Sequence, residues 1–387
     1  MRLGIISLIQ APYWEPLYTV LSRSNGLTVR VFHLQAGDSV RGWSAMACPY
    51  DAVQVPCLTP EELYPVPVIG VMNPGLVRRI RGFRPDCLLI HGYSYLSHWL
   101  TVRWAIRSHT PYLLWGDSNS LQLDGRGLRS RLKQAWLEYF CRHAAGVLTI
   151  GTLNQDFWRY YGVEPQRFFY APLAVDNEYF ASRAAGLRPR KQAERESLGL
   201  PPGRLLLYAG RLVPNKNLEA LLRVLAARRG SASAPLALAL VGDGPERDRL
   251  AAIVRDLRLD AVYPFPFQSQ EALARFYAVA DALILPSRSE PWGLVVNEAM
   301  AAGLPVLLSR STGCRPDLLQ EGVNGFSFDE RDPDSIRACL DHFAALSNGE
   351  VERMGARSSE CISAWTYTAT LAGIRRALDA AAAQRQP

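Results

Sequence analysis

The sequence of 387 residues contains no apolar run that approaches the roughly 20 residues required by a membrane-spanning helix. Its first residues, MRLGIISLIQAP, form an apolar stretch that is too short and wrongly flanked for a secretory signal peptide. We therefore expect a cytoplasmic protein. Peripheral contact with the inner face of a membrane is the one form of membrane association that this leaves open.

Cysteine is sparse and shows no pattern. The seven cysteines are an odd number, lie far apart and never form a Cys-x-x-Cys pair, which excludes the common zinc sites and disulfide frameworks. His91 and His98 lie near each other in the sequence, but no third ligand follows at a useful spacing. The sequence therefore predicts buried thiols in a reducing compartment, no metal site and no cofactor.

Lysine is scarce as well, because only Lys133, Lys191 and Lys216 stand beside 40 arginines. The net charge is +7, and residues 1–175 contribute +6 of it. A basic first half favours an acidic partner, which could be a phosphorylated acceptor, an anionic membrane or nucleic acid; a genome biased towards arginine would give the same excess. Lys216 is of interest because a compact ammonium group stands where arginine is the rule.

The chain is long enough for two domains, and its apolar fraction of 48% is enough for two cores. In the first half, short apolar runs alternate with segments long enough to be helices, which predicts a parallel sheet covered on both faces. Ligands bind such sheets beyond the carboxyl ends of the strands, so ligand contacts are expected from the loops there. The expected strands are 3–9, 28–34, 86–91, 112–116 and 146–150, and the loops are 10–15, 91–95, 116–119 and 151–154.

Residues 128–143 predict a basic, amphipathic helix. One interpretation is a helix that binds an anionic membrane surface, because basic side chains with aromatic neighbours suit that interface. The other is an ordinary helix packed on the sheet with a solvated basic face, which is the more common arrangement. The predicted apolar stripe consists of Leu128, Leu132, Ala135, Trp136, Tyr139 and Phe140.

The first domain is expected to end within 168–180, and the charged stretch 183–197 is interpreted as a linker. A second sheet is then predicted to begin with a strand at 205–210. The loop after this strand contains Arg211 and Lys216. A guanidinium group can bind two phosphate oxygens while an ammonium group supplies a point charge, so this pair suits a diphosphate.

Another strand, at 236–241, is followed by Gly242 and Gly244 in a turn that leads into a helix. This is only half of a dinucleotide-binding fingerprint, although glycines let the backbone approach a ligand closely. Further along, Asp332-Pro-Asp334 could be mistaken for a metal-binding Asp-x-Asp pair. Because a helix follows directly, we interpret it as a helix cap.

Residues 282–307 combine a buried strand, a loop and a helix. The loop carries Glu290, Gly293 permits a tight turn into the helix 294–302, and Glu298 lies about one turn inside that helix. The N–H groups of Gly293, Leu294 and Val295 are expected to lack helical acceptors, which favours anion binding there. A ligand with phosphate and hydroxyl groups, such as a sugar nucleotide, would satisfy this arrangement. The alternative is an ordinary strand-loop-helix unit with acidic residues near the helix N-terminus.

Taken in order, these segments resemble the retaining GT-B glycosyltransferases of family GT4. The resemblance rests on Arg211 and Lys216 after YAG, VGDGPE at 241–246, the Glu-x7-Glu pattern at 290–298, and GVNG at 322–325. The strong match covers about residues 165–345, whereas residues 1–150 resemble the family only in architecture. The family resemblance implies two Rossmann-like parallel-sheet domains that face each other across a cleft. The implied domains are 1–172 for the acceptor, 173–365 for the donor, and a C-terminal helix at 366–387 that packs back on the first domain.

The resemblance also implies roles for single residues. Arg211 and Lys216 would hold the donor diphosphate, Glu298 the ribose hydroxyls, and Glu290 the donor sugar. The first domain departs from the family at Ala11-Pro12-Tyr13-Trp14, where many members have a Gly-Gly loop, and Asp117 stands where several members have histidine. The expected catalytic residues are Glu290, Arg211, Lys216 and Asp117. The expected donor-binding residues are Gly210, Arg211, Lys216, Gly242, Gly244, Phe267, Gln268, Glu290, Gly293, Leu294, Val295 and Glu298.

These observations predict a retaining glycosyltransferase that moves a sugar from a nucleotide diphosphate sugar to a glycan, lipid-linked or small-molecule acceptor. A UDP-sugar is the favoured donor and a GDP-sugar the next, with no metal and no nucleic-acid partner expected. One alternative is a nucleotide-sugar epimerase or hydrolase on the same fold. Another is a non-catalytic binding protein, against which the complete donor pattern argues.

Overall fold

The computed structural model of the chain describes residues 1–11, 13–35, 48–60, 63, 66, 68–123, 127–229 and 234–384. The chain divides into two compact units. Unit 1 comprises Met1–Pro172 with Tyr367–Pro387, and unit 2 comprises Leu173–Thr366. Pro12 of the expected acceptor loop, the side chain of Leu128 and the last three residues of the expected C-terminal segment lie outside the described part.

Unit 1 contains a seven-stranded parallel sheet in the order β3-β2-β1-β4-β5-β6-β7. The five predicted strands are confirmed to within two or three residues, and the two edge strands, β3 and β7, were not predicted. Both edge strands have three residues and only partly buried or exposed side chains, so no apolar run marks them. The strands are β1 (Arg2–Ser7), β2 (Thr28–His33), β3 (Ala52–Gln54), β4 (Cys87–His91), β5 (Tyr112–Trp115), β6 (Gly146–Thr149) and β7 (Phe168–Tyr170).

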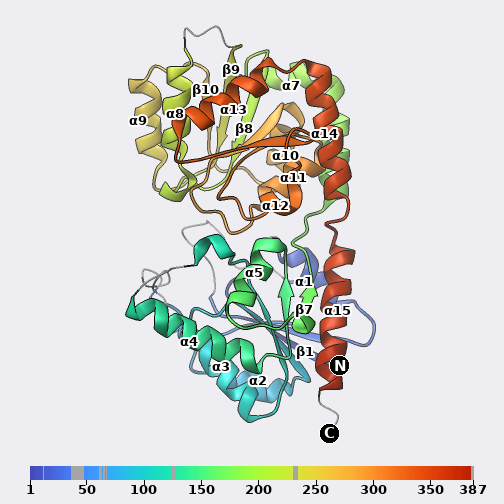
Figure 1. The fold of residues 1–387 in the computed structure, drawn as a ribbon. Coiled ribbons are helices and arrows are strands. Elements are labelled where there is room, and N and C mark those ends of the chain that lie inside the picture. The colour runs from blue at the N-terminus through green and yellow to red at the C-terminus, as the bar shows by residue number, and fades with distance from the viewer. Residues whose placement is uncertain are drawn as a thin grey trace. The chain divides into compact units, whose positions relative to one another are not determined.

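Helices connect these strands, as the alternating pattern predicts (Figure 1). The helix predicted at 128–143 has those bounds, but its predicted apolar face is partly wrong. Leu132 is 63% exposed and Tyr139 is 37% exposed, whereas Leu137 is buried. The α-helices of unit 1 are α1 (Glu15–Ser22), α2 (Leu76–Phe83), α3 (Leu96–Arg107), α4 (Leu128–His143), α5 (Thr152–Tyr160) and α15 (Tyr367–Ala383), with 3-10 turns η2 (Ser120–Gln122) and η3 (Pro165–Arg167).

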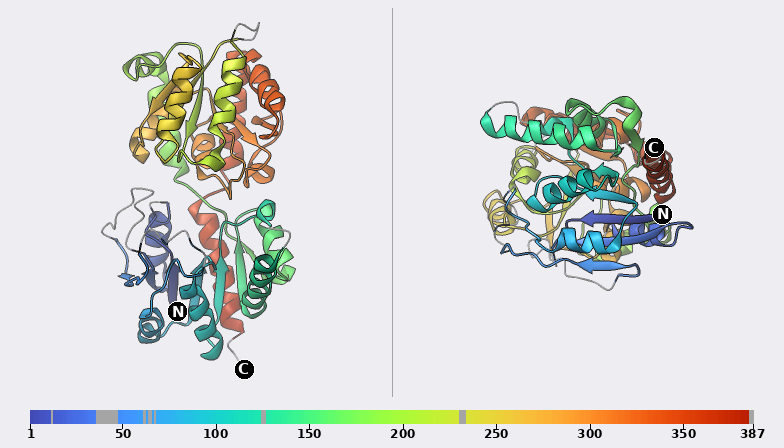
Figure 2. Two further views of the ribbon diagram at one scale, coloured as in Figure 1. Left: turned by 90° about the vertical axis from the view of Figure 1, so that its left-hand side faces the viewer. Right: turned by 90° about the horizontal axis from the view of Figure 1, so that it is seen from below.

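The last helix, α15, packs along strands β4 to β7 of unit 1. Figure 1 shows it in red beside β7, and the left view of Figure 2 shows it in red beside the strands of this sheet. The Thr370 hydroxyl donates to the Pro172 carbonyl at 2.6 Å. A Cβ atom at Gly373 would lie 1.9 Å from the Tyr170 carbonyl oxygen, so glycine is required for this close approach. The chain therefore passes between the units twice, at 172–173 and at 366–367.

Unit 2 contains a six-stranded parallel sheet in the order β10-β9-β8-β11-β12-β13. Its central strands are completely buried because helices cover both faces, which explains their continuous apolar sequences. Two parallel, doubly wound sheets in one chain confirm the predicted architecture. The strands are β8 (Arg204–Ala209), β9 (Leu236–Val241), β10 (Val262–Phe265), β11 (Ala282–Leu285), β12 (Val306–Ser309) and β13 (Gly325–Phe328).

The charged stretch 183–197 is not a linker, and this prediction was wrong. It forms the end of α6 and all of α7, and Arg195 within it is buried with 4% exposure. The Arg195 guanidinium donates to the Val279 and Gly203 carbonyl groups and to Asp281 inside unit 2, so a charged sequence here does not mark a solvated linker. The helices of unit 2 are α6 (Asn177–Leu187), η4 (Arg188–Arg190), α7 (Lys191–Ser197), η5 (Pro214–Lys216), α8 (Leu218–Ala227), α9 (Arg247–Asp256), α10 (Gln270–Val279), α11 (Leu294–Ala301), α12 (Arg315–Leu318), α13 (Pro333–Ala345) and α14 (Asn348–Ile362).

The predicted helix cap is confirmed in unit 2. The Asp332 side chain accepts a hydrogen bond from the Asp334 backbone N–H at 3.0 Å, at the start of α13. The Asp332 side chain therefore caps the helix, because it satisfies a backbone N–H group that has no helical acceptor.

Candidate functional site

The loops that follow β8 and β11 are tied together by their backbones. The Arg288 N–H donates to the Asn215 carbonyl at 2.8 Å, and the Asn215 side-chain amide donates to the Ser289 carbonyl at 2.9 Å. These bonds join two loops that are more than 70 residues apart in sequence. As a result, the ammonium group of Lys216 forms an ion pair with the carboxylate of Glu290.

The Glu290 backbone is held from its other side by the loop after β12. The Gly313 N–H donates to the Glu290 carbonyl at 2.9 Å, and the Glu290 N–H donates to the Ser311 carbonyl at 3.3 Å. With 11% of its side chain exposed, Glu290 is largely shielded from water, as is Lys216 with 16%. The structure therefore supplies a fixed, partly desolvated pair of opposite charges. Their electrostatic interactions are stronger here than at the protein surface.

Helix α11 begins directly after this loop, at Gly293. Gly293 has φ +98°, a conformation that other residues rarely adopt, and no side chain caps the helix here. The preceding turn is fixed because the Trp292 indole N–H donates to the Asn297 side chain at 3.0 Å, and the Asn297 amide donates to the Leu173 carbonyl at 3.0 Å. The first N–H groups of α11, which include those of Leu294 and Val295, form the positive end of the helix dipole.

Glu298 lies one turn further along α11, and its carboxylate accepts a hydrogen bond from the Tyr277 hydroxyl at 2.6 Å. Although part of the residue's surface remains exposed, burial of the carboxyl group raises its pKa to about 7, and the Tyr277 hydrogen bond opposes this shift only in part. Glu298 therefore changes its charge near neutral pH. Tyr277 comes from α10, and the sequence carried no signal for this contact.

Gly242 and Gly244 allow two loops to interlock. A Cβ atom at Gly242 would lie 1.9 Å from the Gly210 carbonyl oxygen, and one at Gly244 would lie 2.4 Å from the Leu212 carbonyl oxygen. The Leu212 N–H in turn donates to the Asp243 carbonyl at 2.8 Å. The structure thus explains these glycines by the approach of another backbone segment, and a contact with the donor stays a prediction for Gly210, Gly242 and Gly244.

Arg211 directly follows this interlocked segment. Its carbonyl accepts a hydrogen bond from the Tyr208 hydroxyl at 2.8 Å, which fixes the backbone at the end of β8. The structure therefore places Arg211 and Lys216 on one loop, as predicted. Phe267 and Gln268 lie in the loop after β10, where Phe267 is 64% exposed and Gln268 donates to the Pro266 carbonyl at 3.1 Å. Their role towards a nucleotide base stays a prediction.

Asp117 belongs to unit 1, where it follows β5 and is exposed. The Asn154 amide donates to the carbonyl groups on either side of it, at 2.8 Å to Gly116 and 2.7 Å to Ser118. This loop is therefore held in place at the carboxyl end of the first sheet. Its catalytic role stays a prediction. The expected donor-binding residues belong to unit 2, so the described residues of unit 1 by themselves show no contact between them and Asp117.

The carboxyl ends of the strands of unit 1 also carry a cluster of rings that the sequence did not reveal. Trp14 lies 4.8 Å from His91 and 4.8 Å from Trp115 between ring centroids, and Tyr18 lies 5.8 Å from His91. Burial lowers the pKa of His91 to about 3 and that of nearby His33 to about 4, so both imidazoles are neutral. The only sequence signal for this cluster was a histidine at the end of a predicted strand. That signal pointed to His91 and to none of the rings around it.

Among the described residues, no group of three or more His, Cys, Asp or Glu side chains could hold a metal ion. No helix in the same residues is long and apolar enough to cross a membrane.

Part of the chain is similar to known proteins. Residues 190–359 match the family described as "Glycosyl transferases group 1". The chain is 26% identical over 323 residues to the sulfoquinovosyl transferase SQD2 of Arabidopsis thaliana, covering 80% of this chain and 57% of that protein. It is 30% identical over 320 residues to the D-inositol 3-phosphate glycosyltransferase of Mycobacterium bovis, covering 77% of this chain and 63% of that protein. The chain thus spans about three-fifths of the length of these relatives.

Solved structures support the same fold. The sucrose-phosphate synthase of Thermosynechococcus elongatus superimposes with a TM-score of 0.75 at 20% identity, over 98% of this chain and 100% of that one. The Anabaena protein HepE, in complex with UDP and glucose, superimposes with a TM-score of 0.73 at 15% identity, over 98% and 99% of the two chains. The structure thus has the GT-B fold, and residues 190–359 match the group 1 glycosyltransferases, as the sequence motifs predicted.

Proposed function

We propose that the protein is a retaining glycosyltransferase that moves a sugar from a nucleotide diphosphate sugar to an acceptor hydroxyl. The observation that carries this proposal is the Lys216–Glu290 ion pair, which is built beside the uncapped N-terminus of α11. Such a site offers positive charge for a diphosphate and a carboxylate for sugar hydroxyl groups. The match of residues 190–359 to the group 1 glycosyltransferases supports the same reaction class.

In the reaction, the bond between the sugar's anomeric carbon and the diphosphate oxygen breaks, and a bond from the acceptor oxygen to that carbon forms. The departing diphosphate gains negative charge, which Arg211, Lys216 and the N–H groups at the start of α11 are placed to stabilise. The acceptor's proton passes to an oxygen of the departing phosphate on the same face of the sugar. This route retains the anomeric configuration and needs no nucleophile from the protein.

Lys216 must then exchange partners during binding. In the structure its ammonium group is paired with Glu290, whereas a bound diphosphate would share or take that ammonium. Release of the Glu290 carboxylate would leave it available to accept hydrogen bonds from the donor sugar. The loop bonds through Asn215 keep both groups in reach of the same ligand while this exchange occurs.

Glu298 suits the ribose of the donor. In its charged form a carboxylate accepts hydrogen bonds from two neighbouring hydroxyl groups, as the 2′ and 3′ positions of a ribose present them. The Tyr277 hydroxyl already donates to this carboxylate and would help to orient it. Because the raised pKa of Glu298 is about 7, donor binding is expected to be sensitive to pH near neutrality.

A UDP-sugar is the donor we favour, with a GDP-sugar next. The solved HepE complex holds UDP and glucose, and another structure with this fold, at 12% identity, holds UDP-2-fluoro glucose. The acceptor we propose is a glycan, lipid-linked or small-molecule hydroxyl. The names of the relatives include inositol 3-phosphate, which fits a small-molecule acceptor.

The test is a binding panel followed by product analysis. Thermal unfolding is measured with UDP, GDP, ADP and their sugars, and the right nucleotide at 100 times its Kd should add roughly 2.7 kcal/mol of stability. The matching sugar donor is then incubated with candidate acceptors, and the anomeric configuration of the product is read by NMR. Retention supports the proposal, and inversion contradicts it. Complete conversion of the donor without acceptor would instead identify an epimerase or a hydrolase.

A further inference from the structure

A cavity of about 990 Å³ opens in unit 2 at the amino ends of its strands. Its lining includes Arg204 and Leu236, the first residues of β8 and β9, and Asp281 and Pro305, which directly precede β11 and β12. The candidate functional site lies at the carboxyl ends of the same sheet. The cavity is therefore a separate feature, and the proposed glycosyl transfer does not use it.

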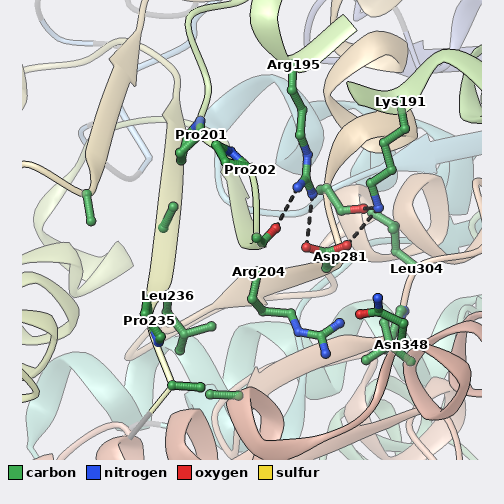
Figure 3. Close-up of a pocket in the computed structure, with 18 of the residues that line it drawn as sticks. Lys191, Arg195, Pro201, Pro202, Arg204, Pro235, Leu236, Asp281, Leu304 and Asn348 are labelled. Carbon is green, nitrogen blue, oxygen red and sulfur yellow. Dashed lines mark hydrogen bonds and ion pairs between the residues drawn. The ribbon is translucent and has the colours of Figure 1, made fainter. Parts of the chain in front are cut away.

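One wall of the cavity is a fixed network of charges around Asp281. Arg195 donates to the Asp281 carboxylate at 2.9 Å and Lys191 donates to it at 2.7 Å, as Figure 3 shows with dashed lines. The Leu205 N–H adds a third bond at 2.6 Å. Since Arg195 is only 4% exposed, this network is part of the rigid body of unit 2 and is present before any ligand binds.

Another part of the lining carries hydrogen-bond donors that the described residues use only in part. Arg204 extends towards Asn348 in Figure 3, and its guanidinium, which has five N–H groups, donates to the Leu346 carbonyl at 2.5 Å. Asn348 is the first residue of α14, a helix of 15 residues, and is exposed. Ser347 and Glu350 form a capping box that satisfies the N–H of Glu350, so the N–H groups of Asn348 and Gly349 are the part of this positive helix end that adjoins Arg204 at the cavity.

Positive charge dominates the inner part of the lining. Four cationic side chains surround the cavity, and Asp281 is the carboxylate that pairs with two of them, whereas the other lining carboxylates, Asp260 and Glu352, are exposed. Burial lowers the pKa of Lys191, which means that its charged form is incompletely solvated. An anion in the cavity would offset that loss of solvation. The cationic side chains are Arg188, Lys191, Arg195 and Arg204.

The remaining walls are apolar. Prolines and leucines present aliphatic surface that suits the ring or carbon chain of a small molecule, and the volume falls at the upper end of that found for small-molecule sites, roughly 300–1,000 Å³. An inorganic ion alone would leave most of this space unfilled. The apolar lining residues include Pro201, Pro202, Pro235, Leu236, Leu304 and Pro305.

We propose that this cavity binds a small phosphomonoester, with its phosphate on Arg204, Lys191 and the N-terminus of α14 and its carbon body against the prolines. A phosphate offers three acceptor oxygens to donors that arrive from different directions, and a planar guanidinium can bind two of them at once. A ligand here would contact Asp281, which holds the starts of β8 and β11. These are the two strands whose other ends lead to Lys216 and Glu290.

The test is calorimetric titration of the whole chain with glucose 6-phosphate, inorganic phosphate and glucose, each in the presence of saturating UDP. The expected result is saturable binding of glucose 6-phosphate, weaker binding of phosphate and none of glucose. Arg204→Gln and Asn348→Asp should each weaken phosphomonoester binding at least tenfold. Arg255→Gln, which removes an exposed charge from α9 in the same unit, should leave binding unchanged.

Asn348→Asp keeps the test valid if Arg204→Gln fails to fold, because a carboxylate at the start of a helix favours the helix while it repels an anion. The proposal is overturned if neither phosphate compound binds saturably, or if UDP displaces the phosphomonoester competitively. It is overturned equally if Asn348→Asp binds within twofold of the unchanged protein. UDP binding by both variants should remain normal, which separates a failure here from a failure of the proposed transferase site.

Discussion

The carboxyl ends of the two sheets differ in chemistry. In unit 2, the loops beyond the strands are joined by backbone hydrogen bonds and carry a partly desolvated ion pair, Lys216 with Glu290. In unit 1, the corresponding region holds aromatic rings that contact His91 edge-on, and burial lowers the pKa of His91 to about 3. One region is built for charged groups. The other holds neutral rings that are buried or half-buried, and the loop after β5 adds the exposed Asp117.

Under the proposed function, this difference suits two sheets of the same kind to different tasks. A diphosphate needs positive charge at a fixed position. Rigid loops can keep charged side chains in place and partly shielded from water, where their electrostatic interactions are stronger. A sugar or polyol acceptor can instead use aromatic faces and neutral hydrogen-bonding groups. The basic excess of the first half is found on helices such as α2 and α4, as in Arg78 and Arg131, rather than in the ring cluster around His91. Charge count alone would favour unit 1 for an anion site, whereas the proposed donor site lies in unit 2.

The largest expected effect tests the charged side of this comparison. Lys216→Ala removes the ammonium that pairs with Glu290, so a buried carboxylate and the donor diphosphate both lose their counter-charge. We expect a loss of about 2–5 kcal/mol of transition-state stabilisation, so kcat/KM for transfer should fall roughly 30-fold to several thousand-fold. Steady-state kinetics with the donor found in the binding panel measures the change.

Lys133→Ala on α4 is the matched control, since it removes the same group from unit 1. Its kcat/KM should stay within twofold of the unchanged protein, and both variants should keep the circular dichroism spectrum of the folded chain. Near-normal turnover by Lys216→Ala would show that the ion pair is structural and that the comparison of the two sheets has no functional meaning.

The second effect tests the rigidity of the interlocked loops in unit 2. Gly244→Ala would place a Cβ atom 2.4 Å from the Leu212 carbonyl oxygen, at a residue with φ +153°. We expect a loss of about 3 kcal/mol of unfolding free energy from strain and overpacking together. Urea-induced unfolding gives this value, and donor binding should weaken as Arg211 on the neighbouring loop shifts.

Gly199→Ala separates the two causes. Gly199 also has a positive φ, +68°, but an added Cβ atom would have nothing within 4 Å. Its cost should therefore be the conformational strain alone, about 1 kcal/mol. Equal losses in the two variants would mean that the close backbone contact contributes little to stability.

Sequence reasoning recovered the local features of the charged site and missed its long-range contacts. Glu290, Gly293 and the helix that follows lie within one short stretch, so their order alone indicated an anion site. Tyr277 reaches Glu298 from another helix, 21 residues away, and no periodicity could reveal that contact. The same limitation explains why Arg195, which binds groups 84 to 86 residues away, was interpreted as part of a linker.

In unit 1 the buried strands were predictable because continuous apolar runs mark them. The ring cluster was not, because Trp14 and Trp115 come from segments that meet only when the strands adopt their order in the sheet. The exposed face of α4 was predicted incorrectly for a related reason. Leu132 fits an apolar stripe in sequence, but Leu137 is the residue that packs inwards. Helical periodicity gave the helix and left its orientation undecided.

The third prediction concerns Glu298, whose carboxyl pKa is raised from 4.5 to about 7 by burial. Because the folded protein then binds a proton that the unfolded chain releases, the unfolding free energy contributed by this group falls as the pH rises from about 4.5 to 7. Glu298→Gln, which stays neutral, should gain stability relative to the unchanged protein above pH 7, on the order of 2 kcal/mol, and lose this advantage near pH 4.5.

Urea unfolding at several pH values measures this difference, and Glu360→Gln, at an exposed site on α14, is the control that should show none of it. Donor binding gives the opposite trend. The KM for the donor should rise as the pH falls below about 7, because the protonated carboxyl can no longer accept both ribose hydroxyl groups. A pH-independent KM would remove Glu298 from the proposed donor site.

The smallest expected effect tests whether the basic first unit meets a membrane. Helix α4 exposes Leu132 and Tyr139 beside basic residues such as Arg131, which is the pattern of a helix that lies in an anionic interface. We propose weak binding to vesicles rich in anionic lipid, measured by co-sedimentation, and expect release at about 0.5 M salt because screening then acts within a few Å. Leu132→Asp should reduce this binding without changing the fold, since the side chain is 63% exposed. Equal sedimentation with neutral vesicles, or an unchanged result for Leu132→Asp, would show that the exposed residues of α4 are an ordinary helix surface, and that unit 1 obtains its acceptor without a membrane.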